Sequence, residues 1–157
     1  MAYPKSPAIS LWNPLWSVIW SYIFTPIFGA FIQRTNWSEM GEHDRTANSN
    51  LWLALGLIFM FGYLFLEPWL PDSAWSDWYF LGSYSLFYLL WVFCDGWHQV
   101  SFVKDRYGDN YHHRLWGKPI MLGAGGLVLW MAMSLTYVIA LVTLFPDIAL
   151  PQLPPKP

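Results

Sequence analysis

Long uncharged runs alternate with short charged segments along this chain. Beyond residue 45, three long runs hold no charged residue, the shortest with 17 residues and the longest with 28. A helix needs about 20 apolar residues to cross the hydrocarbon core of a bilayer, and lipid offers no partner to an exposed strand edge. We therefore expect a single-domain, all-α integral membrane protein with transmembrane helices over residues 47–67, 77–97 and 119–145.

The first apolar stretch, residues 11–33, differs because two prolines interrupt it. Asn13-Pro14 and Thr25-Pro26 each combine a favourable N-cap residue with Pro at the first helical position. The pattern therefore predicts two helices of about ten residues. Each would be about 15 Å long, which is half the thickness of the hydrocarbon core. It is either a re-entrant hairpin, which we favour, or a fourth, Pro-kinked span. Polar residues recur every fourth position along its first helix: Asn13, Ser17, Ser21 and Thr25.

The distribution of bases predicts the orientation. Loops 34–45 and 95–118 together hold six Lys and Arg residues, whereas loop 67–77 holds three acids and no base. Basic loops stay on the cytoplasmic side of a membrane. We therefore expect loops 34–45 and 95–118 in the cytoplasm of a bacterial cell, the spans in its inner membrane, and the C-terminus, with its Pro-rich tail 147–157, outside.

Composition agrees with this class of protein. The 157 residues are 55% hydrophobic, 20% aromatic and 11% charged, against about 25% charged in a typical soluble domain. A net charge of −2 excludes a nucleic-acid-binding protein, because no basic field is available to attract phosphates. The single cysteine, Cys94, excludes an intramolecular disulfide, and we expect it to pack in the core as a small hydrophobic residue.

Loop 95–118 is the richest polar segment. From Asp95 to Tyr107 it can continue the preceding helix, which Gly108 is suited to end. Trp residues and bases on such a segment are typical of headgroup anchoring or of a surface that docks a protein partner. The candidate partner or headgroup contacts are Asp95, Trp97, His98, Lys104, Arg106, His112, His113, Arg114, Trp116 and Lys118.

No set of residues in the sequence points to catalysis or to a cofactor. The spacing of His98, His112 and His113 fits no metal motif, and haem would need histidines inside the spans. Neither a Gly-x-Ser-x-Gly sequence nor a phosphate-binding loop is present. We therefore predict no metal, no cofactor and no catalytic residue, and the sequence favours a protein that is not an enzyme.

Two stretches resemble small uncharacterised bacterial inner-membrane proteins. The first is Phe24-Thr25-Pro26-Ile27-Phe28-Gly29-Ala30, followed by Asn36-Trp37. The second lies in the polar loop and comprises Gln99, Val103-Lys104, Tyr107-Gly108, Tyr111, Arg114, Trp116 and Lys118-Pro119. The resemblance implies a bacterial origin and a compact helical fold, and it implies no activity.

These observations favour a non-enzymatic protein that binds membrane lipid together with a membrane protein partner or a second copy of itself. Two forms of this function are an immunity protein against a membrane-active toxin and an accessory subunit of a membrane complex. The alternative is an enzyme or carrier that handles a lipid or quinone at the cytoplasmic interface through Asp95, His98 and the loop bases. An ion channel is a weaker third hypothesis, because we expect no buried charges in the spans and see no polar lining beyond Ser83, Ser85, Ser134 and Thr136.

Overall fold

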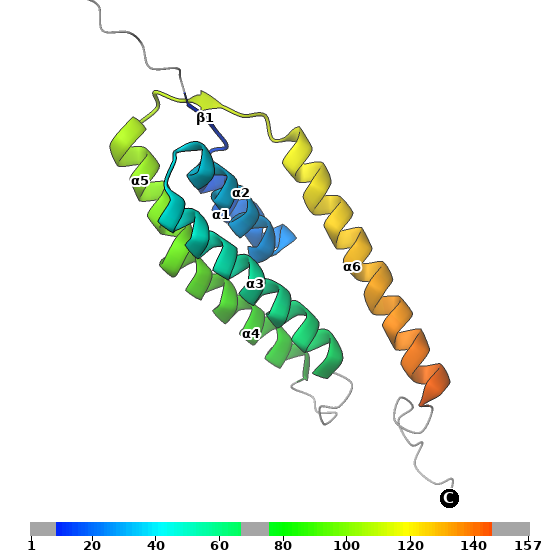
Figure 1. Ribbon diagram of the computed structural model, residues 1–157. Helices are drawn as coiled ribbons and strands as arrows, with labels where there is room; N and C mark the ends of the chain where they lie inside the picture. Colours follow the sequence, from blue (N-terminus) through cyan, green and yellow to red (C-terminus); the bar gives the residue numbers. More distant parts are fainter. Residues whose placement is uncertain (1–8, 67–75, 146–157) are drawn as a thin grey trace, which may run out of the picture.

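The computed structural model describes residues 9–66 and 76–145, and most of them are helical (Figure 1). The Pro-rich tail 147–157 and most of loop 67–77 lie outside the described residues. In chain order the elements are β1 (Ser10–Leu11), α1 (Pro14–Phe24), α2 (Pro26–Glu39), α3 (His43–Leu66), α4 (Ser76–Trp91), the π-helical η2 (Val92–Gly96), α5 (Trp97–Tyr107), β2 (His112–His113) and α6 (Gly117–Leu144).

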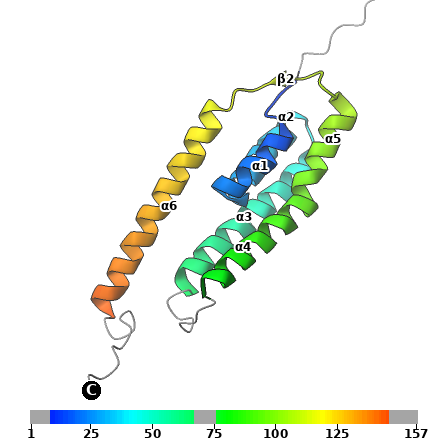
Figure 2. The same ribbon diagram turned by 180° about the vertical axis from the view of Figure 1, so that it is seen from behind.

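Helices α3 and α4 lie side by side along most of their length (Figures 1 and 2). Aromatic side chains join them, because Phe87 of α4 contacts both Trp52 and Phe59 of α3 at centroid distances of 5.8 and 4.9 Å. The ring centroids of Tyr63 and Phe80 lie 4.4 Å apart, closer to the C-terminal end of α3. Such pairs add to the packing energy beyond the area they bury.

The chain stays helical from α4 through η2 into α5, as the sequence predicts. Gly108 ends α5 with a φ of 53°, and its N–H donates to the Lys104 carbonyl. A positive φ is easily adopted by glycine, which explains why the helix ends here. Val103 is buried, while Lys104 and Asp105 are exposed, so α5 has an apolar face toward the protein and a charged face away from it.

Helices α1 and α2 form the hairpin that the prolines predict. Asn13 caps α1, since its Oδ1 accepts hydrogen bonds from the N–H groups of Leu15 and Trp16. The matching prediction for Thr25 is wrong, because its side chain caps nothing. Thr25 instead reverses the chain with a φ of 107°, and its carbonyl accepts from the N–H groups of Phe28 and Gly29.

The polar stripe of α1 faces inward. Ser17 and Ser21 are completely buried, while Trp16, Ile19 and Ile23 on the opposite side are exposed. In a helix at the surface of a water-soluble domain the apolar stripe faces the core. The reversed arrangement places apolar side chains where a helix in an apolar solvent would have them.

A short parallel ladder joins the segment before α1 to the segment between α5 and α6. Ser10 pairs with His112, and Leu11 pairs with His113. Leu11 is also buried in a cluster with Val103 and Tyr111, against which Met40 packs from the end of α2. Both ends of the α1–α2 hairpin therefore lie at the same end of the molecule as α5 and β2. We call this region, formed by β1, the α2–α3 turn, α5 and β2, the polar end.

Helix α6 stands apart from the other helices (Figures 1 and 2). It approaches α1 closely at Gly123, where an added Cβ would lie 2.8 Å from the Phe24 ring. Two aromatic pairs join it to α3, Phe61–Trp130 at 5.5 Å and Phe65–Tyr137 at 5.2 Å.

Among the residues that the structure describes, two helices, α3 and α6, are long and apolar enough to cross a membrane. They correspond to the spans predicted over residues 47–67 and 119–145. The span predicted over residues 77–97 is not confirmed. It corresponds to α4 and η2, and α4 is 16 residues long, shorter than the about 20 residues that cross a hydrocarbon core.

Candidate functional site

A buried carboxylate fixes the π-helical segment at the junction of α4 and α5. Asp95 is only 3% exposed, and its two oxygens accept hydrogen bonds from Asn48 Nδ2 and Ser49 Oγ, both at 2.9 Å. Both donors belong to α3. Short π-helical segments often occur at functional sites because they re-aim side chains within a helix. Here the segment turns Asp95 toward α3, where donors satisfy its negative charge.

A network of buried amides connects α2 to η2 and α5. Asn36 Nδ2 donates to Gln99 Oε1 at 3.0 Å, and Gln99 Nε2 donates to the Gln33 carbonyl at 2.9 Å. Gln33 Nε2 in turn donates to the Gly96 carbonyl at 3.1 Å. Asn36 also exchanges two hydrogen bonds with the backbone of Trp12. The side-chain oxygen of Gln33 is buried without a hydrogen-bond partner in the part of the chain that the structure describes, but the other amide groups of this network are paired. Such paired buried polar groups favour one arrangement of the polar end.

Cations and aromatic rings brace the outside of the polar end. The Arg45 guanidinium lies 4.9 Å from the ring centroid of Trp37 and 4.7 Å from that of Phe102. Two ion pairs connect the α5–α6 segment to the α2–α3 turn, Arg106–Glu42 at 2.8 Å and Arg114–Glu39 at 2.7 Å. Each exposed pair contributes little alone, but together they hold the segment against the helices.

The sequence-predicted contacts fall into two groups. Three of them bind within the protein: Asp95 as described above, and Arg106 and Arg114 through their ion pairs. The others are exposed or partly exposed at the polar end: Trp97, His98, Lys104, His112, His113, Trp116 and Lys118.

The predicted histidines do not converge on one point. His98 Nδ1 lies 3.0 Å from the Cys94 carbonyl, and His113 packs against the Tyr111 ring at 4.3 Å. In the described part of the chain, no three His, Cys, Asp or Glu side chains are grouped as metal ligands would be. Burial, with the nearby Asp109 charge, raises the pKa of the Tyr111 phenol, so this group stays protonated at neutral pH.

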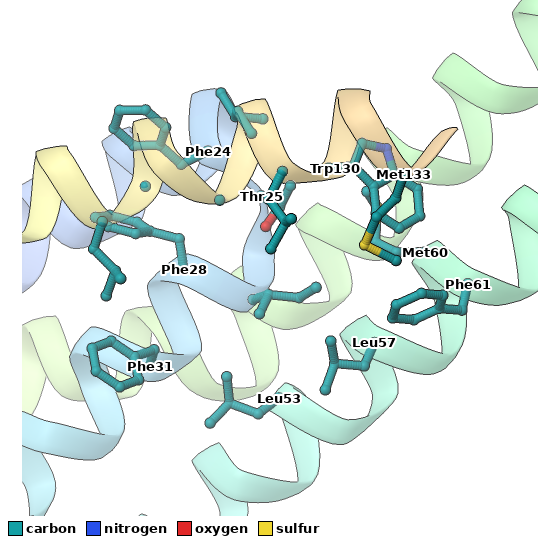
Figure 3. A pocket seen from close by; sticks show the side chains of 16 residues that line it. Phe24, Thr25, Phe28, Phe31, Leu53, Leu57, Met60, Phe61, Trp130 and Met133 are labelled. Carbon is teal, nitrogen blue, oxygen red and sulfur yellow. The ribbon is translucent and has the colours of Figure 1, made fainter. Parts of the chain in front are cut away.

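An apolar pocket of about 370 Å³ lies between the α1–α2 hairpin, α3 and α6, below the polar end. Figure 3 shows Phe28 and Phe31 from α2, Leu53 and Leu57 from α3, and Trp130 from α6 around this space. A volume of about 300–1,000 Å³ is usual for small-molecule sites. The sequence gives no sign of this pocket, because the pocket depends on the distance between α6 and the α1–α2 hairpin.

The pocket and the Asp95 cluster are separate features. Neither Asp95 nor His98 lines the pocket. The arrangement around Asp95 therefore joins helices, whereas the pocket offers an apolar volume to a ligand.

No protein-family model, no curated protein and no solved structure matches the chain. The resemblance to small bacterial inner-membrane proteins therefore stays a prediction. The geometry of the polar end and of the pocket is the basis for inferring a function.

Proposed function

We propose that the chain is a non-enzymatic, multi-pass protein of the bacterial inner membrane that binds a membrane protein partner through its polar end. In this proposal α3, α4 with η2, and α6 cross the membrane, and the α1–α2 hairpin enters and leaves on the cytoplasmic side. The partner is a membrane-active toxin, if the protein confers immunity, or a complex of which it is an accessory subunit.

The single observation that carries this proposal is the bracing of the polar end. Buried amides, the β1–β2 ladder and two ion pairs hold α5 in one orientation. A surface that is already ordered loses little conformational entropy when a partner binds. On its outer side Trp97, Lys104 and Asp105 are exposed and follow one face of α5 at helical spacing.

The alternative, an enzyme or carrier that uses Asp95 and His98 on a lipid or quinone, has less support. The Asp95 carboxylate is buried, and both of its oxygens are already hydrogen-bonded to α3. A reacting substrate would have to displace Asn48 or Ser49 to reach it.

The orientation of the hairpin is tested by tags at the two termini. We expect an N-terminal tag to be accessible to protease only in inverted membrane vesicles, and a C-terminal tag only in spheroplasts. The reason is that Ser10 and Leu11 pair with the 95–118 segment, which carries the cytoplasmic bases. A Pro-kinked span predicts the opposite side for the N-terminal tag, so accessibility of that tag in spheroplasts would contradict re-entry.

Partner binding is tested by photo-crosslinking in cells. A photoreactive amino acid at Lys104 is expected to give a discrete crosslinked species, whereas the same amino acid at Val138 is expected to give only lipid adducts. Val138 is the matched control because it is exposed on α6, far from the polar end. Substitution of Trp97 by Ala should reduce the Lys104 crosslink at least about fivefold, in the range of an aromatic interface contact.

The crosslinked species also tells which form of the proposal holds. A species of twice the monomer mass would assign the surface to a second copy of the chain. Absence of any protein crosslink at both Lys104 and Trp97, in cells where the protein is folded and in the membrane, would overturn the proposal.

A further inference from the structure

Polar side chains border the apolar pocket on the side that faces the polar end of the molecule, and we call them the rim of the pocket. Arg34 follows the lining residue Phe31 by three positions on α2, and Asn50 precedes Leu53 by three positions on α3. Residues three or four apart lie on the same face of a helix. Arg34 Nε donates to Asn50 Oδ1 at 2.6 Å, so these two side chains connect α2 and α3 just above the pocket.

Helix α6 adds a second base to this rim. Lys118 precedes the lining residue Leu122 by four positions, so it lies on the pocket-facing side of α6, one turn above the lining. Both Arg34 and Lys118 are exposed. Within residues 9–66 and 76–145, the ion pairs involve Arg106 and Arg114 and neither rim base.

The length of the pocket matches one leaflet of a bilayer. From Leu122 to Met133, the first and last lining residues on α6, the helix rises about 16 Å. Half of a hydrocarbon core of about 30 Å is about 15 Å. The lining is almost wholly apolar along this length, and the two bases lie at the end where the headgroups of that leaflet would be.

We propose that this pocket binds one anionic phospholipid of the cytoplasmic leaflet, with an acyl chain between α2, α3 and α6 and its phosphate against Arg34 and Lys118. The proposal rests on the multi-pass placement given above, and it does not depend on the protein partner at α5.

The acyl chain and the headgroup contribute differently. Bilayer lipid is as apolar as the pocket, so the chain gains little from the hydrophobic effect, and it enters because an empty pocket lacks van der Waals contacts. Selectivity among lipids must therefore come from the rim. Basic sites between membrane helices recognise anionic headgroups, and each base contributes a preference of about fivefold.

Native mass spectrometry tests the headgroup contact. Protein is extracted from vesicles of equal phosphatidylglycerol and phosphatidylcholine, and the retained lipid is counted. We expect one phosphatidylglycerol per chain in the wild type. Arg34→Gln and Lys118→Gln should each lower the ratio of retained phosphatidylglycerol to phosphatidylcholine about fivefold. Lys156→Gln, which removes a base of the C-terminal tail that the proposed placement puts on the opposite side of the membrane, is the matched control and should retain the wild-type ratio.

Two adjacent glycines of α6 test the pocket itself. Gly126 lines the pocket and Gly125 does not, and a Cβ added at either position meets no atom within 4 Å. Gly126→Leu should fill the pocket and abolish lipid retention without disturbing the backbone, and both changes should favour helix formation. Gly125→Leu should retain the lipid as the wild type does.

Equal retention of the two lipids by the wild type would overturn the headgroup assignment. Wild-type retention by Gly126→Leu would overturn the acyl-chain assignment, and a dimer lost only in that variant would show that a second copy occupies the pocket instead. The tags at the two termini report separately on the membrane placement, so failure of the lipid site is distinguishable from failure of that placement.

Discussion

Gly29→Ala is expected to destabilise the protein by about 1–3 kcal/mol, the usual cost of an added methyl group that a packed core cannot absorb. Gly29 lies where α1, α2 and α4 meet. A Cβ at this position would lie 2.6 Å from Trp91 Cζ2, and still closer to Trp91 Cη2 and Ser21 Oγ. Trp91 and Ser21 are completely buried, so neither side chain has space into which it can move.

The matched control for this prediction is Gly62→Ala on α3. Nothing lies within 4 Å of a Cβ added to Gly62, and replacing Gly by Ala in a helix is worth up to about 1 kcal/mol in favour of the helix. Thermal unfolding in detergent is followed by tryptophan fluorescence. The midpoint temperature should fall for Gly29→Ala and rise for Gly62→Ala. Equal midpoints would show that the hairpin does not pack against α4 as closely as the structure has it.

Local signals of the sequence account for many of the helix ends. Pro14, Pro26 and Gly108 act through backbone geometry that is independent of tertiary structure, and each begins or ends a helix as predicted. The N-cap at Asn13 follows from the same reasoning. Thr25 differs because its position in the tight reversal between α1 and α2 is set by the packing of the two helices.

Hydrophobicity did not show which side of each helix faces inward. Cys94 lies in an apolar run and was expected in the core, yet it is exposed. Ser17 and Ser21, although polar, are buried. In an apolar environment the exposed face is as hydrophobic as the core, so an apolar run identifies a helix without identifying its buried side.

The buried amide network of α2, η2 and α5 was not predicted from the sequence. Asp95 was predicted as a partner or headgroup contact, whereas it is buried and accepts hydrogen bonds from Asn48 and Ser49. Gln33, Asn36 and Gln99 come from two helices more than 60 positions apart, and their pairing depends on the register between α2 and α5. A faint signal was present, since each is an amide on the otherwise apolar face of its helix. Buried amides in such positions generally find partners.

The link between Asp95 and Ser49 is expected to be the strongest single connection between α3 and the π-helical segment. Asp95→Ala removes both acceptors and leaves the buried Ser49 hydroxyl without this partner. Hydrogen bonds to charged groups contribute about 1.5–3 kcal/mol each, so we expect a loss of about 2–4 kcal/mol in the free energy of unfolding. Ser49→Ala removes one donor and should cost about 1–3 kcal/mol.

A double-mutant cycle separates this link from other effects of the substitutions. Because the two side chains are in direct contact, Asp95→Ala combined with Ser49→Ala should cost at least about 1 kcal/mol less than the sum of the single variants. Thr136→Ala is the control partner, since within the described residues the Thr136 hydroxyl donates only to the Ala132 carbonyl of its own helix. The losses in the free energy of unfolding caused by Thr136→Ala and Asp95→Ala should be additive in the double variant.

The cycle also reports on α5, whose orientation depends on the π-helical segment. The π-helical segment shifts the phase of α5 by about one residue relative to a regular α-helix. If the segment relaxed into a regular α-helix, α5 would therefore rotate by about 100° about its axis. This rotation would carry Gln99 and Val103 out of their buried positions. We therefore expect Asp95→Ala to weaken the Lys104 crosslink as well as lowering stability. A coupling energy near zero, with an unchanged crosslink, would show that the buried carboxylate does not hold the polar end in place.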